Sequence, residues 1–173
     1  KGLLKVLWEK HYSTEEIISA GLAYQRENQS VIERFRDRIM WTLTDSSGRP
    51  IGFSARRISE DKKIPKYLNS PETPLYNKSY TLLGINHAKK SIIQHQSVII
   101  VEGQTDVMAV QASGYDNVVA SCGTAFGAGH LKVLNQLSKR IKDKDLSFIF
   151  CFDGDSAGAK AAWRVFNTFP ELQ

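Results

Sequence analysis

The sequence predicts an α/β protein in two parts: an α+β first half, and a second half built on a parallel sheet. Residues 97–101, 117–121 and 147–152 are short apolar runs without polar alternation, which is typical of strands buried on both faces. Helical segments separate them, so the order is β-α-β-α-β-α. The first half instead alternates charged and apolar residues, as half-exposed strands do. We expect domains of residues 1–90 and 91–173.

The composition is that of a folded protein with an uneven charge. The chain has 173 residues and a net charge of +5. Residues 1–90 hold 16 Lys or Arg against 10 Asp or Glu, whereas residues 91–173 hold 7 against 8. A basic half joined to an acid-bearing half suggests a polyanion partner and a metal site in one chain. A mildly basic soluble protein without such a partner is the alternative.

Other features of the composition exclude some classes of protein. The chain has no apolar run of the roughly 20 residues that a membrane helix needs, so we expect no contact with a membrane. Cys122 and Cys151 are the only cysteines, and they form no CxxC pair. This pattern favours a reduced, cytoplasmic setting without a disulfide framework or a zinc site in this chain.

Two helices are expected at the start of the chain. Residues 2–10 carry apolar side chains at helical spacing. Ser13 and Glu16 have the spacing of a capping box, which predicts a second helix over residues 14–20 that ends at Gly21. Both helices are interpreted as scaffold.

A hairpin is expected next. Residues 34–44 alternate in polarity, residues 45–50 have turn composition, and residues 51–58 form the returning strand. A strand of this period carries three arginines on one face: Arg34, Arg36 and Arg38. Because like charges on one face repel, the pattern favours a surface that binds a polyanion. A solvated face with arginines for solubility is the alternative.

A loop over residues 66–74 follows the hairpin. Lys66, Tyr67 and Asn69 combine a cation, an aromatic ring and a carboxamide, which suits contact with a sugar, base or phosphate. Such loops also serve as plain connectors. A helix is expected over residues 84–96.

The second half contains alternating strands and helices after that. The sequence predicts helices over residues 106–113, 129–140 and 156–167, which follow the three strands in turn, and a solvated charged turn over residues 139–145. His130 is expected to have a structural role on its helix face.

Carboxylates follow two of the strands. Glu102 comes directly after residues 97–101, and Asp153 and Asp155 follow the third strand. If these strands are neighbours, the carboxylates meet at the carboxyl edge of the sheet, where open α/β folds bind ligands. Carboxylates that lie close together need a compensating cation, and hard oxygen ligands suit Mg²⁺ or Mn²⁺. Two metals would favour phosphoryl transfer, and Glu102 could instead act as a general base.

Helix capping is the alternative for these acids. Asp106 precedes an apolar helix, as a common N-cap does. One cap per helix does not explain both Asp153 and Asp155. Gly103 and Gly154 have no side chain, so we expect backbone and metal to approach closely there.

The motifs of the second half resemble those of a Toprim domain, the acidic module of primases, topoisomerases and some nucleases. Glu102-Gly103 matches the strand-end Glu of that family, and Asp153-Gly154-Asp155 matches its Asp-x-Asp. Residues 102–107, 121–125 and 153–158 look like the versions found in bacterial DnaG-type DNA primases. Residues 34–40, residues 51–53 with Arg56, and residues 66–73 resemble the basic lobe of the primase polymerase core, so the resemblance covers almost the whole chain.

The resemblance implies a DNA-directed RNA polymerase that makes short RNA primers for replication by nucleotidyl transfer with Mg²⁺ or Mn²⁺. It implies a single-stranded DNA template, NTPs and an RNA–DNA hybrid product as partners. Glu102, Asp153 and Asp155 would hold the metal, with Asp106 as a fourth, supporting catalytic residue. Arg34, Arg36 and Arg38 would contact DNA. The implied nucleotide-binding residues are Arg56, Lys66, Tyr67, Asn69 and Lys78.

Some family features differ or lie outside the chain. Thr105 stands where many members have an apolar residue. The family's further acidic motif, its zinc-binding domain and its helicase-binding domain are not in this sequence, so we expect a fragment of the polymerase core with an incomplete metal site. We therefore expect activity from the full-length protein rather than from the fragment.

Two other classes share the module. A type IA topoisomerase usually carries Arg-Glu after the Asp-x-Asp, where this chain has Ser156-Ala157, and a Toprim nuclease is a related alternative. Non-catalytic recombination mediators are not expected to carry the basic lobe.

Overall fold

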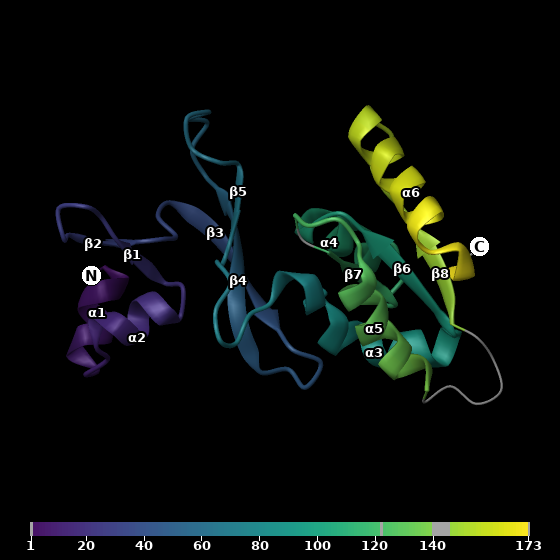
Figure 1. Ribbon diagram of the computed structural model, residues 1–173, viewed down its shortest axis with the longest axis horizontal. Helices are drawn as coiled ribbons and strands as arrows, with labels where there is room; N and C mark the ends of the chain where they lie inside the picture. Colours follow the sequence, from purple (N-terminus) through teal and green to yellow (C-terminus); the bar gives the residue numbers. More distant parts are fainter. Residues whose placement is uncertain (1, 122, 140–145, 173) are drawn as a thin grey trace. The chain divides into compact units, whose positions relative to one another are not determined.

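The computed structural model describes residues 2–121, 123–139 and 146–172 (Figure 1). The chain divides into two compact units. The first comprises Lys1–Leu43 and Ile51–Asn77, and the second comprises Thr44–Pro50 and Lys78–Gln173. Cys122 and most of the expected charged turn at residues 139–145 lie outside the described residues.

The first unit begins with helices α1 (Leu3–Glu9) and α2 (Thr14–Ser19), followed by the antiparallel pair β1 (Ala23–Gln25) and β2 (Val31–Glu33). The predicted capping box is confirmed. The Glu16 backbone N–H donates to Ser13 Oγ at 3.1 Å, and the Ser13 N–H donates to Glu16 Oε2 at 2.7 Å. Gly21 follows α2 with a φ of +72°, a left-handed conformation that favours glycine.

A second antiparallel sheet has the strand order β3-β4-β5. Its strands are β3 (Arg38–Thr44), β4 (Pro50–Arg57) and β5 (Tyr67–Asn69). The expected hairpin is present. The prediction that residues 66–74 form only a loop was wrong, because the pairing of β5 with β4 places Tyr67 opposite Arg56. A three-residue strand is too short to show the period of two in the sequence.

The strand expected over residues 34–44 starts only at Arg38. Asp37 has a φ of 52°, in the left-handed region, so the chain turns between Arg36 and Arg38. Aspartate tolerates this conformation better than most residues do. Arg34, Arg36 and Arg38 therefore do not form the single strand face that the alternation predicted.

The second unit contains the parallel sheet, with strand order β7-β6-β8. Along the chain its elements are η1 (Lys78–Tyr80), α3 (Ile85–His95), β6 (Ser97–Val101), α4 (Gln104–Ala112), β7 (Val118–Ala120), α5 (Ala128–Ser138), β8 (Ser147–Phe150), α6 (Ser156–Thr168) and η2 (Pro170–Leu172). The expected order of strands and helices is confirmed. So is the condition that the strands before Glu102 and Asp153 are neighbours.

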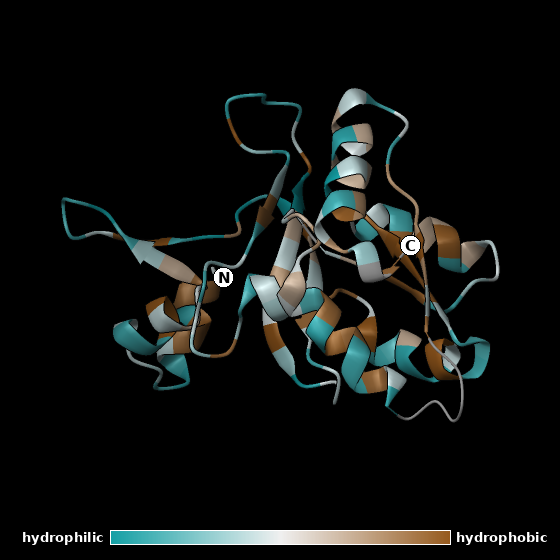
Figure 2. Ribbon diagram, turned by 45° about the vertical axis from the view of Figure 1, so that its right-hand side comes forward, coloured by the Kyte–Doolittle hydropathy of each residue, from teal (hydrophilic) through white to brown (hydrophobic). Residues whose placement is uncertain are grey.

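One face of this sheet carries the main hydrophobic core. Ile100 of β6 belongs to a buried cluster with Ile92 of α3, Leu134 of α5 and Val165 of α6. Phe150 of β8, which pairs in register with Ile100, is partly buried and packs against this cluster. Figure 2 shows the apolar strands in brown. Right-handed crossovers in a β7-β6-β8 sheet put α4 and α5 on opposite faces, so α4 covers the other face. That helix contacts β7.

The prediction that all three strands are buried on both faces was wrong for β8. Ile149 keeps 49% of its surface exposed, whereas Val98 and Ile100 of the central strand are fully buried. β8 is an edge strand of the described sheet, and α4 lies against β7 at the other edge. None of the described helices combines the length and the apolar character needed to cross a lipid bilayer.

Candidate active site

The carboxyl ends of β6 and β8 bring Glu102 and Asp153 together. The Cys151 backbone N–H donates to the Ile100 carbonyl at 2.9 Å, which extends the pairing beyond β8. The Asp153 N–H then donates to Glu102 Oε1 at 3.1 Å. The carboxylate of Glu102 is thereby tied to the turn that carries Asp153.

This meeting point is a topological switch in the sheet. After β6 the chain enters α4 on one face, and after β8 it enters α6, which packs into the core on the other face. Open α/β sheets bind ligands in the crevice that such a divergence leaves at the carboxyl ends of the strands. The backbone thus places two acidic side chains where a ligand has access.

Asp155 acts as the N-cap of α6. Its Oδ1 accepts from the backbone N–H groups of Ala157 and Gly158, both at 2.9 Å. Capping, which was the alternative interpretation, therefore applies to Asp155 but not to Asp153, whose side chain is exposed. One oxygen of Asp155 is committed to the helix, where the helix dipole also favours a negative charge.

At this turn the glycine that has no room for a side chain is Gly158. The sequence had suggested Gly103 and Gly154 instead. A Cβ on Gly158 would lie 2.0 Å from the Asp153 carbonyl oxygen, so the first turn of α6 can pack on Asp153 only with glycine there. A Cβ on Gly154 would meet nothing within 4 Å, and one on Gly103 would meet only Asp106 Oδ2, at 3.5 Å. The expectation of close approach by protein atoms at Gly103 and Gly154 was wrong.

Asp106 holds the start of α4 from within the helix. The helix begins at Gln104, two residues before the predicted start, so Asp106 is in its first turn and is not the N-cap. Its Oδ2 accepts from the Gly103 N–H at 2.8 Å, and the Thr105 hydroxyl lies 3.4 Å from Oδ1. Asp106 thus shapes the turn that follows Glu102.

The carboxylates of Glu102, Asp153 and Asp155 are ligands that suit a divalent cation, but they are not arranged as a preformed metal site. Within residues 2–121, 123–139 and 146–172, no three acidic, histidine or cysteine side chains come together closely enough to hold a metal. The acids expected to converge are therefore not gathered into one cluster among these residues, and Asp155 Oδ1 caps α6. The metal assignment stays a prediction. Glu102 and Asp153 remain as hard oxygen donors without a described basic partner. Mg²⁺ is often held by one or two carboxylates together with substrate phosphates.

Three residues predicted to bind nucleotide lie together in the first unit. Arg56 and Tyr67 are opposite each other on β4 and β5, with the guanidinium carbon 5.7 Å from the ring centroid. Lys66 Nζ is 5.5 Å from the same centroid. Tyr67 keeps 39% of its surface exposed. Two cations beside an accessible aromatic ring can bind phosphate and stack a base.

Asn69, which was also predicted to bind nucleotide, makes hydrogen bonds within the first unit. Its Oδ1 accepts a hydrogen bond from the hydroxyl of Ser54, which is fully buried. Its backbone carbonyl accepts from Arg34. The Asn69 side chain therefore links β5 to β4.

Lys78 belongs to the second unit, where a buried histidine holds its backbone. The Gly127 N–H donates to His130 Nδ1 at 3.2 Å, which leaves Nε2–H to donate to the Lys78 carbonyl at 2.9 Å. His130 is 1% exposed, and this burial lowers the pKa of its imidazole, against hydrogen bonds to the Lys78 and Thr81 backbone that raise it. The expected structural role of His130 is confirmed.

The three arginines predicted to bind DNA differ in their surroundings. Arg34 donates through Nε and Nη2 to the Asn69 carbonyl at 3.2 and 3.1 Å. Arg38 Nη1 donates to the Pro65 carbonyl at 2.9 Å. Arg36 is exposed, and no hydrogen bond joins it to another described residue. Two of the three are thus turned toward the protein's own backbone.

Comparison with known proteins places the chain in a family. The family described as "DNA primase catalytic core, N-terminal domain" matches residues 1–89. The chain belongs to this DnaG-type primase family. The family described as "Toprim domain" matches residues 96–173, which include Glu102, Asp153 and Asp155.

Primases of this family are similar to the chain in sequence and structure. A DNA primase of Streptomyces coelicolor is 44% identical over 165 residues, which are 95% of this chain and 25% of that protein. The RNA polymerase domain of Mycobacterium tuberculosis primase DnaG superposes with a TM-score of 0.87 at 41% identity, covering 98% of this chain and 55% of that one. A DnaG primase catalytic domain bound to ssDNA has a TM-score of 0.79 at 34% identity, covering 97% and 50%. The chain spans about a quarter of the length of the curated relatives it matches.

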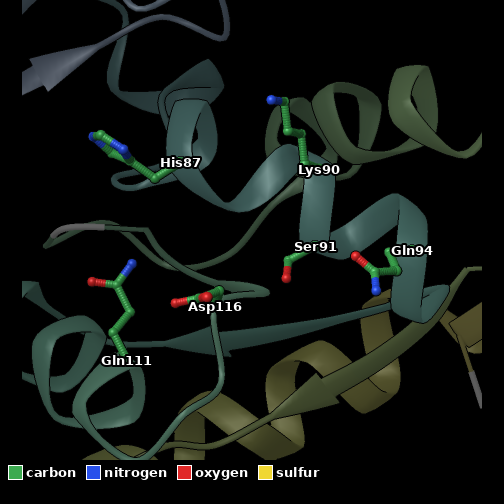
Figure 3. Close-up of a pocket in the computed structure, with 6 residues that line it drawn as sticks. All are labelled: His87, Lys90, Ser91, Gln94, Gln111 and Asp116. Carbon is green, nitrogen blue, oxygen red and sulfur yellow. The ribbon is translucent and has the colours of Figure 1, made fainter.

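One polar depression lies away from the carboxylates of this primase unit. It has a volume of about 550 Å³ between α3, α4 and the segment before β7 (Figure 3). Gln94 and Asp116 line it just before β6 and β7, so this part of it is at the amino-terminal edge of the sheet, opposite Glu102. The lining residues are His87, Lys90, Ser91, Gln94, Gln111 and Asp116, and none of them was predicted as a site residue.

Sequence reasoning missed the residues that support the site in this primase fold. Gly158 lies in a quoted motif, but the need for glycine there comes from its contact with Asp153. Arg57 was not singled out, yet its guanidinium donates to the Ile64 carbonyl. The signal available for Arg57 was its position beside Arg56.

Proposed function

We propose that the protein containing this chain is a DNA primase that synthesises short RNA primers on single-stranded DNA. The observation that carries the proposal is the hydrogen bond from the Asp153 N–H to Glu102 Oε1, which sets two acids at the switch point of a Toprim-type sheet. The match of the first half to the primase core supports the same reaction.

In this proposal Glu102 and Asp153 hold a divalent cation, Mg²⁺ or Mn²⁺, and Asp155 contributes the oxygen that does not cap α6. The cation would neutralise the triphosphate charge and polarise the phosphoryl group during nucleotidyl transfer. Asp106 keeps the turn after Glu102 in shape through its bond to the Gly103 N–H. Glu102 is also placed to accept a proton from the attacking hydroxyl.

The cationic residues bind the substrates. Arg56, Lys66 and Tyr67 contact the nucleotide, with the ring as a stacking surface and the cations on phosphate. Lys78 contacts a phosphate from η1, whose backbone His130 holds. Arg36, exposed and without a hydrogen-bond partner among the described residues, contacts the template.

The whole protein would act in the cytoplasm. It would also carry a zinc-binding domain and a helicase-binding domain outside this chain, and it would release an RNA–DNA hybrid.

The test is primer synthesis from NTPs on single-stranded DNA by the full-length protein and its Glu102→Gln variant. Glutamine keeps an oxygen that can accept from the Asp153 N–H but removes the charge and the base, so we expect activity to fall by about 100-fold or more. Asp116→Asn, an acid-to-amide change at the opposite edge of the same sheet, is the matched control and should leave activity unchanged. Wild-type activity in Glu102→Gln would refute the proposal.

A further inference from the structure

We infer that Arg34, Arg38 and Arg57 are positioning residues, which hold the segment bearing Lys66 and Tyr67 in its binding conformation through hydrogen bonds to backbone carbonyls. The inference rests on the proposed role of Lys66 and Tyr67 in nucleotide binding. It assigns Arg34 and Arg38 a task other than the DNA contact that the sequence suggested.

The carbonyl of Asn69 is held from outside the sheet. Arg34 lies just after β2, and its Nε and Nη2 both donate to this oxygen, at 3.2 and 3.1 Å. A guanidinium can direct two N–H groups at one acceptor, which fixes the orientation of both partners. β5 ends at Asn69, so Arg34 anchors that end of the strand.

The other end of the segment is held by two more guanidinium groups. Arg38 Nη1 donates to the Pro65 carbonyl at 2.9 Å, and Arg57 Nη1 donates to the Ile64 carbonyl. The Arg57 backbone N–H also donates to the Lys66 carbonyl at 2.9 Å. The chain just before Lys66 is therefore bonded to residues of β3 and β4.

Between these anchors lies the short segment with the proposed binding residues. Only three residues of β5 pair with β4, and β5 is an edge strand. Lys66 and Tyr67 are both exposed at its start. Such a short edge strand gains little stability from its own pairing, so the arginine–carbonyl bonds at both ends add the constraint that the pairing lacks.

The charges of the three arginines argue for a structural use of their N–H groups. Burial lowers the pKa of Arg38, and the positive charges of Arg57 and Arg34 lower it further, so the three side chains lie close together. Arg34 is partly desolvated, and this burial lowers its pKa. Neither Arg34 nor Arg38 has an acidic partner within the part of the chain that the structure describes. Carbonyl acceptors are therefore what offsets the cost of gathering and burying these cations.

Lysine substitutions separate this role from a purely electrostatic one. Lysine keeps the positive charge but presents one compact ammonium in place of a planar fork. A phosphate contact that depends on charge largely survives Arg→Lys. The Asn69 carbonyl, held by two N–H groups of the Arg34 guanidinium, does not keep that pair of bonds. At Arg38, lysine replaces the Nη1 group that donates to the Pro65 and Lys66 carbonyls with an ammonium of different reach and geometry.

The experiment measures two quantities in the full-length protein: KM for NTPs during primer synthesis, and affinity for single-stranded DNA as a function of salt. We expect Arg34→Lys and Arg38→Lys each to raise the KM for NTPs by about fivefold to tenfold, with kcat nearly unchanged. DNA affinity and its salt dependence should match wild type. Arg26→Lys, the same change at an exposed arginine to which no role is assigned, is the matched control and should alter neither quantity.

Lys66→Ala distinguishes failure of this inference from failure of the proposed function. If Lys66→Ala raises the KM for NTPs while both Arg34→Lys and Arg38→Lys behave as wild type, the positioning role is refuted and the nucleotide role stands. If the lysine variants lose DNA affinity at unchanged KM, the guanidinium N–H groups contact the template in place of the carbonyls, and the inference is overturned. If Lys66→Ala leaves the KM unchanged, the nucleotide role fails and the inference with it.

Discussion

The two units of the chain position their functional side chains by different means. In the second unit, Glu102 directly follows a parallel strand buried in the core, and the turn after the neighbouring strand carries Asp153. In the first unit, Tyr67 is on a three-residue edge strand whose ends are held by arginine side chains bonded to backbone carbonyls.

The difference has a physical origin. A parallel sheet with a core on one face specifies which residues reach its carboxyl edge, because burial fixes both the register and the end of each strand. An exposed antiparallel edge has no such constraint, and its geometry depends on side-chain hydrogen bonds from elsewhere. Substitutions should therefore have local effects on chemistry in the second unit and effects on binding through backbone shape in the first.

The largest effect is expected at the acidic edge. Asp153→Asn together with Asp155→Asn should abolish measurable Mn²⁺ binding in calorimetry, because both lose a charged oxygen donor. Asparagine is as good an N-cap as aspartate, so α6 should survive. Since Asp155 already caps the helix, Asp153→Asn alone should account for most of the loss.

The control for the metal experiment is Asp116→Asn, which removes one carboxylate from the other edge of the sheet. It should leave the Mn²⁺ titration unchanged. Equal Mn²⁺ affinity in the wild type and the double variant would show that these carboxylates do not bind the metal. The second unit would then differ from the first in its fold but not in having a metal site.

The next effect concerns the exposed arginine of the first unit. Arg36→Ala should weaken single-stranded DNA binding severalfold at low salt and reduce the slope of log K against log salt by about 1, as loss of one phosphate contact does. Fluorescence anisotropy with labelled DNA at several salt concentrations measures both. Arg49→Ala removes the same charge from a residue paired with Asp45 at 2.8 Å and should have a smaller effect. Equal slopes for wild type and Arg36→Ala would remove Arg36 from the template surface.

A pH effect is expected in the second unit. Burial lowers the pKa of His130, so the native state binds fewer protons than the unfolded state at pH values below about 6.5, the ordinary value for histidine. Stability is therefore fully present above that pH and is lost as pH falls toward the lowered native pKa, with a slope of at most one proton. Urea unfolding at several pH values measures the free energy of unfolding and its dependence on pH.

His130→Gln should remove this pH-dependent part, because glutamine does not titrate. His95→Gln, at the exposed end of α3, is the control and should preserve it. An identical pH dependence in His130→Gln and wild type would mean that the protonation of His130 does not limit stability.

The smallest effect is expected at the capping box of α2. Ser13→Ala removes the acceptor for the Glu16 N–H and should lower the free energy of unfolding by about 1 kcal/mol. Ser19→Ala at the other end of the same helix is the matched change and should be nearly neutral. A loss at Ser13 no larger than at Ser19 would show that this cap contributes little to the first unit.

Local patterns in the sequence were sufficient for much of the fold. The capping box at Ser13, the parallel strand before Glu102 and the helix after Asp155 all depend on interactions among residues close in the chain, or on burial that composition reveals. The predictions were wrong where a single residue changed the local geometry. Asp37 adopts a left-handed conformation, so the strand expected from residue 34 begins only at Arg38, and the hydrophobic pattern does not predict such a conformation.

The sequence by itself determined that acids follow buried strands and that cations and an aromatic ring gather in the first half. Only the tertiary structure decided which of these groups meet. Strand order placed Asp153 at Glu102, the packing of α6 on Asp153 required Gly158, and the cap of that helix took an oxygen of Asp155. The fold also turned Arg34 and Arg38 toward backbone carbonyls. Hydrogen bonds between distant segments depend on strand order and packing, which a residue pattern along the chain does not contain.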